Sequence, residues 1–308
     1  MLKAKTLICL FMLVGLMLPA QAMDIRSGIA EPFHEVYALI EQGKGRAAER
    51  ALDSLKRAHG NTADYHFIAG QVDMLKMNDA SMMRMPFIAR SMRKSWEKAV
   101  EINPNHEVSV FSLAMFYFAA PGIVGGDKEK AGRLMERLEA LESGWQFPLR
   151  VTFLMNSESD QYEAIEQAYN AWFEAYPNLV SARMNYVFMR NNSDDRSKVL
   201  EQLQIIDRLV QAEPEQVSAE QRAQIDYQWG KMAAETGLAL EQGRDRLLTL
   251  LAENNVPENI GNGFVHARLS AIYQQLNEQE SAQQHYQQAQ ALAEGNSDLV
   301  ALLERLEV

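Results

Sequence analysis

Residues 264–294 read FVHARLSAIYQQLNEQESAQQHYQQAQALAE, and their spacing predicts two helices that pack against each other. Leu269 and Tyr273 are four residues apart, so they share one face of the first helix. The polar pair at 277–278 forms the turn. The second helix carries two small residues and an aromatic residue at matching intervals: Ala282, Tyr286 and Ala289. Small residues there let the two helices approach closely.

The rest of the chain shows helical spacing almost everywhere after residue 30, and strand-like alternation is scarce. Gly and Pro fall mainly between the helical stretches. Residues 161–177 end one further pair. Five segments are predicted to form units like the first: 33–58, 63–105, 107–143, 179–214 and 223–252.

The spacing at 264–294 is that of a tetratricopeptide repeat (TPR), and the chain resembles exported TPR proteins of Gram-negative bacteria. A helix ending in Asn103-Pro104-Asn105, followed by Tyr117 and Gly125-Gly126-Asp127, is similar to a variant that recurs in that group. We therefore predict an all-α fold for residues 23–308, a right-handed TPR-like solenoid of about six irregular helix pairs. The resemblance implies a binding scaffold and supplies no catalytic residues.

The first 22 residues differ from the rest and predict a cleavable signal peptide. Lys3 and Lys5 precede an apolar run from Leu7 to Leu18, and small residues end the segment at Ala20-Gln21-Ala22. A membrane anchor is the alternative, but about 20 apolar residues are needed to span a bilayer. We expect cleavage after Ala22 and a periplasmic location.

Composition limits the chemistry of the mature chain. Cys9 is the only cysteine and lies within the predicted signal peptide, so no disulfide or thiolate site is expected. Loss of Lys3 and Lys5 leaves 28 basic and 41 acidic residues. This negative charge disfavours binding to nucleic acid. Insertion of the mature chain into a membrane is not expected either. The predicted partner is therefore a protein or peptide of unknown identity.

No motif for catalysis, a cofactor or a metal assembles in the sequence. The glycine-rich loop at 121–127 does not match a phosphate-binding loop, because Asp127 stands where the second glycine should be. We interpret the loop as a bend between helices, with Asp127 capping the next helix. Zinc-binding histidine pairs at helical spacing are also missing among the six histidines: His34, His59, His66, His106, His266 and His285.

Residues 82–94 concentrate methionine and positive charge in an acidic protein. Methionine adapts to varied partners, so this segment could contact another protein. The alternative is an insertion helix that fills a gap on the solenoid and directs its arginines outward.

In a TPR array the first helix of each pair lines the concave groove. Projection of the repeat pattern predicts that seven residues face it: Phe111, Met115, Phe118, Tyr186, Arg190, Tyr227 and Lys231. Aromatic residues beside a few charges suit an extended or helical peptide. The alternative is that several of them are buried between helices.

These observations favour a non-catalytic scaffold for protein–protein interaction or assembly. A second hypothesis is an accessory component that handles a solute together with a periplasmic substrate-binding transporter. A third is an enzyme, which would require histidines and carboxylates that the fold brings together.

Overall fold

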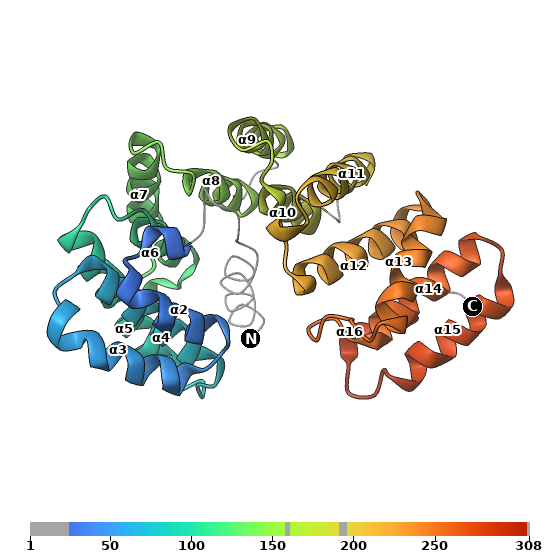
Figure 1. Ribbon diagram of the computed structural model, residues 1–308, viewed down its shortest axis with the longest axis horizontal. Helices are drawn as coiled ribbons and strands as arrows, with labels where there is room; N and C mark the ends of the chain where they lie inside the picture. The colour runs from blue at the N-terminus through green and yellow to red at the C-terminus, as the bar shows by residue number, and fades with distance from the viewer. Residues whose placement is uncertain (1–24, 158–160, 191–195, 307–308) are drawn as a thin grey trace. The chain divides into compact units, whose positions relative to one another are not determined.

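The regular elements of this protein are helices throughout the part of the chain that the computed structural model describes, residues 25–157, 161–190 and 196–306 (Figure 1). The predicted signal peptide lies outside these residues. The chain divides into two units, residues 1–175 and residues 176–308, and each is described by itself.

The described residues of unit 1 form four helix pairs that follow one another along the chain. Their helices are α2 (His34–Glu41) with α3 (Gly45–His59), α4 (Ala63–Asn78) with α5 (Met85–Ile102), α6 (Glu107–Ala119) with α7 (Lys128–Ala140), and α8 (Gln146–Met155) with α9 (Tyr162–Ala175). Short 3-10 turns lie at Ile25–Gly28, Glu31–Phe33 and Gly122–Val124. Each pair contacts the next, as α5 contacts α6 and α7 contacts α8.

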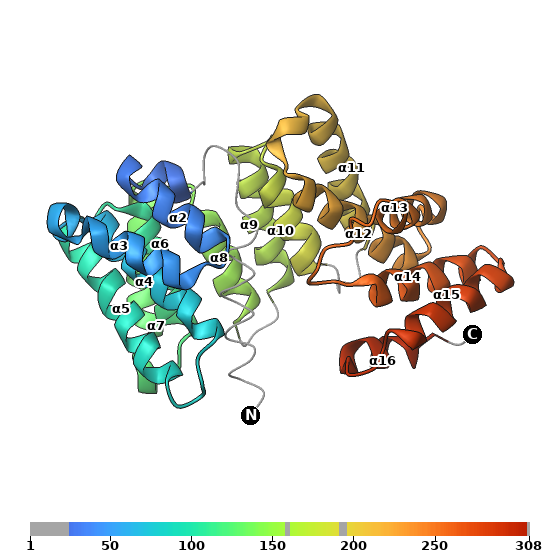
Figure 2. The same ribbon diagram turned by 60° about the horizontal axis from the view of Figure 1, so that its bottom comes forward.

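Unit 2 contains three pairs and a final short helix. Its helices are α10 (Val180–Arg190) with α11 (Arg196–Ala212), α12 (Ala219–Thr236) with α13 (Leu240–Ala252), α14 (Asn262–Gln275) with α15 (Gln279–Ala291), and α16 (Ser297–Leu303). A 3-10 turn at Pro214–Gln216 precedes α12. Figures 1 and 2 show α14 and α15 side by side, as the unit at 264–294 predicts.

Helix ends fall where the local sequence places them. Ser218 and Gln221 form the reciprocal hydrogen bonds of a capping box at the start of α12. The helix α5 ends at Ile102, before Pro104. Asn277, in the predicted turn between α14 and α15, has a left-handed φ of 62°. Asparagine tolerates that conformation better than most residues do.

In two of the pairs, α4 with α5 and α12 with α13, a large side chain packs against a glycine. A Cβ atom added to Gly70 on α4 would lie 2.2 Å from Nε1 of Trp96 on α5, and that indole donates a hydrogen bond to the Phe67 carbonyl at 3.2 Å. Gly230 on α12 meets Leu247 in the same way. These contacts bring the paired helices close together.

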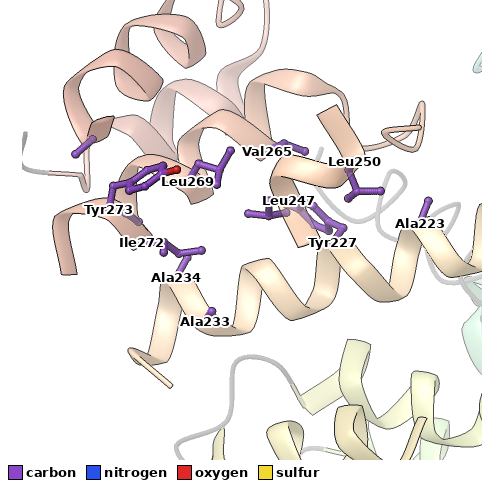
Figure 3. Close-up of a cluster of buried hydrophobic side chains, with 12 residues drawn as sticks. Ala223, Tyr227, Ala233, Ala234, Leu247, Leu250, Val265, Leu269, Ile272 and Tyr273 are labelled. Atoms are coloured by element: carbon purple, nitrogen blue, oxygen red, sulfur yellow. The ribbon is translucent and has the colours of Figure 1, made fainter. Parts of the chain in front are cut away.

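The unit at 264–294 packs through the residues that define its spacing. Leu269, Tyr273 and Ala282 belong to a buried cluster that α12, α13, α14 and α15 share (Figure 3). The Ser270 hydroxyl donates a hydrogen bond to the Ala282 carbonyl at 2.9 Å, which shows how closely α15 approaches α14. Ala289 belongs to a second cluster with residues of α16, and the partly buried Tyr286 packs against it.

A charged side chain joins three helices of unit 2. Arg246 on α13 lies 2.6 Å from Asp207 on α11 and 2.6 Å from Asp226 on α12. Its guanidinium also lies 5.0 Å from the centre of the buried Trp229 ring. All three side chains are partly buried, so this network is less screened by solvent than a surface ion pair.

The glycine–tryptophan contact gives a stability prediction. Gly70→Ala should lower the free energy of unfolding by about 1–3 kcal/mol, because the buried Trp96 ring has no room for the added methyl group. Gly132→Ala is the matched control, since no atom lies within 4 Å of the added Cβ. It should raise that free energy by up to about 1 kcal/mol through helix propensity. Chemical denaturation measures the free energy of unfolding of both variants. Equal changes in Gly70→Ala and Gly132→Ala would contradict the packing argument.

Candidate functional site

Among the described residues of unit 1, the four most exposed large apolar side chains lie just before α5, in its first turn and in the loop at 121–127. Met82 is 73% exposed, Met83 85%, Phe87 70% and Ile123 81%. We call these four residues together with Arg90 the Met/Arg surface. Scattered single apolar residues are normal on a protein surface, but a group of this kind is typical of a binding site.

The helix α5 explains why Phe87 is exposed. Its buried face carries Ala89, Met92, Trp96 and Ala99, at intervals of three and four residues. Phe87 and Arg90 belong to the opposite, exposed face. Residues 85–94 are the first turns of the continuous helix α5 and not a separate inserted helix. They do pack on the neighbouring helices through Ala89 and Met92 and leave Arg90 exposed, as one of the two interpretations of this segment predicts.

A hydrogen bond from α5 holds the Ile123 backbone in place. Arg90 Nη2 donates to the Ile123 carbonyl at 3.0 Å. Because Arg90 lies one helical turn after Phe87, this bond brings the loop next to the exposed face of α5. The guanidinium of Arg93 lies against Gly125, where an added Cβ would be 2.8 Å from it. Gly125 has a φ of 104°, so a larger residue there would also strain the backbone.

The loop is also joined to α6. The Asp127 amide donates to the Tyr117 carbonyl at 2.8 Å, and the Tyr117 hydroxyl donates to Glu97 at 2.6 Å. Burial and the Glu97 carboxylate raise the pKa of Tyr117 well above its ordinary value, so the phenol keeps its proton. Asp127 accepts a hydrogen bond from the Lys130 amide at 3.1 Å. The prediction of a bend with Asp127 as helix cap is thus confirmed.

Positive charge surrounds the exposed apolar side chains. Residues 82–94 contain four basic residues and no acidic one. Arg93 is paired with Glu97 at 3.2 Å, whereas Arg84 and Lys94 form no ion pair with any residue that the structure describes. The Met/Arg surface therefore combines apolar area with uncompensated positive charge, in a chain of net charge −11.

The seven predicted groove residues are divided between the two units, and most of their side chains are not accessible. Five are buried: Phe111, Met115, Tyr186, Arg190 and Tyr227. For these five, the alternative of burial between helices is what the structure shows. These five residues are buried because neighbouring helix pairs cover both sides of the first helix of each pair. The first helix α6, for example, is buried along nearly its whole length.

The other two groove residues are partly buried. Phe118 stacks on Phe153 with ring centres 4.3 Å apart, and the Lys128 ammonium lies 5.9 Å from the Phe118 ring centre. Lys231 lies on α12, four residues after Tyr227. The binding of a partner by these residues stays a prediction.

The fold brings together two histidines that sequence analysis treated as separate. His266 and His285 lie on the facing sides of α14 and α15, with their Nδ1 atoms 2.9 Å apart. The Tyr273 ring stacks on His285 with centres 5.4 Å apart. His266 precedes Leu269 by three residues and His285 follows Ala282 by three, so the repeat pattern itself could have indicated their contact.

This histidine pair does not extend into a recognisable metal centre. Across the described ranges, no group of three or more His, Cys, Asp or Glu side chains is arranged to hold a metal ion. In the same ranges, no helix has the length and apolar character needed to cross a membrane.

The histidine pair predicts a pH dependence of stability. Burial, and secondarily the His266 charge, lower the pKa of His285 from 6.5 to about 4. The unfolded chain then binds more protons than the folded chain between these values. The free energy of unfolding should therefore fall as pH drops from 6.5 toward 4. In His285→Gln this part of the pH dependence should shrink, while His59→Gln, which leaves the pair intact, should keep it. Denaturation at several pH values measures the slopes, and an unchanged slope in His285→Gln would refute the assignment.

Comparisons with known proteins identify the fold. No protein-family model matches the chain, and no curated protein matches it. A chain in the crystal structure of the APC/C hetero-tetramer Cut9-Hcn1 is similar in structure, with a TM-score of 0.59 and 15% sequence identity over 89% of this chain. The match covers 48% of that chain, so this protein spans about half of its length. A tetratricopeptide repeat protein from Parabacteroides merdae also matches, at 15% identity and a TM-score of 0.42, over 89% of this chain and 96% of that one.

At this sequence identity the comparison with Cut9-Hcn1 shows the fold alone. Together with the helix pairs described above, it establishes the predicted fold class, an all-α, TPR-like arrangement of irregular helix pairs.

Proposed function

We propose that this protein is a non-catalytic scaffold of the periplasm that binds a partner protein through the Met/Arg surface. The observation that carries the proposal is the exposure of Met82, Met83, Phe87 and Ile123, together with the hydrogen bond from Arg90 that holds the Ile123 backbone beside the exposed face of α5. Exposed apolar side chains on a fixed backbone lose little conformational freedom on binding, which favours affinity.

The fold supports the same conclusion. TPR-like helix pairs commonly serve as protein-binding scaffolds, and the structurally similar Cut9-Hcn1 chain comes from a hetero-tetramer. The charge of the Met/Arg surface defines the partner further. Arg84 and Lys94 would attract an apolar segment that carries acidic residues, and such charge complementarity mainly sets the association rate and the specificity.

Substitution of Phe87 tests this proposal. Wild-type protein should recover a partner from periplasmic extract, and Phe87→Ser should reduce the recovery at least about tenfold, as expected for loss of a central apolar contact. Phe87 is exposed, so the variant should keep its helical circular dichroism and its unfolding midpoint.

The matched control is Leu292→Ser, which removes an exposed leucine from unit 2. It should leave the recovery unchanged. Equal recovery by wild-type protein and Phe87→Ser would contradict the proposed surface. Tyr186→Ala and Tyr227→Ala are unsuitable for this purpose, because both side chains are buried and the changes would test stability.

The proposed location has its own test. Expression of the full chain in a Gram-negative host should yield a periplasmic protein that begins at Met23, which mass spectrometry of the intact protein detects. Ala22→Tyr should prevent cleavage, because the peptidase requires a small residue at that position. A cytoplasmic product that keeps residues 1–22 would contradict export.

A further inference from the structure

A group of positively charged side chains lies in unit 2, away from the Met/Arg surface in the sequence. Tyr227, Lys231 and Glu235 are spaced by four residues along α12 and so share one face of that helix. Arg268, on the neighbouring helix α14, lies 2.8 Å from the Glu235 carboxylate. Arg196, at the start of α11, donates to the Glu235 backbone carbonyl at 2.6 Å.

The positive charge of this group exceeds its negative charge. Arg196, Lys231 and Arg268 are three cations, and among the described residues Glu235 is the carboxylate that acts on Lys231. Within the residues that the structure describes, Lys231 forms neither a hydrogen bond nor an ion pair, although it is partly buried. A partly buried cation without a partner is costly, so an unsatisfied charge of this kind is typical of a binding site.

Arg268 gives a second, independent indication. Its side chain is only 13% exposed, and its Nε atom is buried without a hydrogen-bond partner. Buried polar atoms in folded proteins almost always have a partner. The Glu235 carboxylate and the Tyr227 hydroxyl both pair with this guanidinium, and its Nε–H is the donor that remains for another acceptor.

We propose that Lys231 and Arg268 bind the oxyanion of a small anionic ligand, a phosphate or a carboxylate. The guanidinium would supply directional hydrogen bonds and the ammonium a mobile point charge, which is how arginine and lysine differ in recognising anions. Such a ligand would neutralise the excess charge and provide acceptors for both side chains. The inference does not depend on the proposed protein-binding function.

The electrostatics of Lys231 agree with this arrangement. Burial lowers the pKa of Lys231, the Arg268 and Arg196 charges lower it further, and the Glu235 charge opposes them. The negative charge of a bound anion would oppose these effects and favour the ammonium.

Thermal unfolding of the full mature chain tests the proposal, with inorganic phosphate and succinate as the two probes. Each is titrated at constant ionic strength, balanced with sodium chloride. The unfolding midpoint of the wild type should rise saturably with at least one probe, because a ligand that binds only the folded chain stabilises it. A response to phosphate alone, to succinate alone or to both identifies the class of anion.

Two variants make the test specific. Lys231→Met should weaken the apparent affinity at least tenfold and should keep or raise the midpoint in sodium chloride alone, since an unsatisfied charge is removed. Lys56→Met, a change at an exposed lysine on α3, should behave as the wild type. A wild-type midpoint that never responds saturably, or an equal response in Lys231→Met, would overturn the proposal. Phe87→Ser should keep the anion response, so failure of the protein-binding surface and failure of this site can be told apart.

Discussion

The close approach of paired helices at residues with little or no side chain is the constraint on which the rest of the structure depends. Trp96 fits against Gly70 and Leu247 against Gly230, with no space for even a methyl group. A bulkier residue at either glycine would separate the helices and the larger side chains would lose their contacts. The chain thus needs no disulfide, since interlocking side chains rather than crosslinks hold each pair together.

The sequence predicts the helix pairs well where small and large residues alternate at the right intervals. It predicts α14 and α15 with their turn, and it identifies the cap residue Asp127. It misses α8, the short first helix of a pair whose second helix, α9, it detects. Pro148 in the first turn of α8 breaks the expected pattern, although a proline is tolerated there.

Sequence patterns are less informative about which faces stay exposed. Periodicity shows that Tyr186 and Tyr227 lie on first helices, but only the neighbouring pairs determine that they are covered. The unusual composition of 82–94 did indicate a distinct surface, while the buried Met92 shows that its methionines divide between core and solvent. The contacts between His266 and His285, and between Arg268 and Glu235, join different helices and so depend on tertiary structure.

The contact of each helix pair mainly with its sequence neighbours has a consequence for how the chain folds. Most of the helices that contact each other are close in sequence, so few long loops have to close during folding; one exception is the contact of residues Ile25–Gly28 with α6. Chains of this kind fold rapidly, because short loops close at little entropic cost. Folding can therefore begin at whichever pair forms first and spread to the adjacent pairs, as in a one-dimensional array.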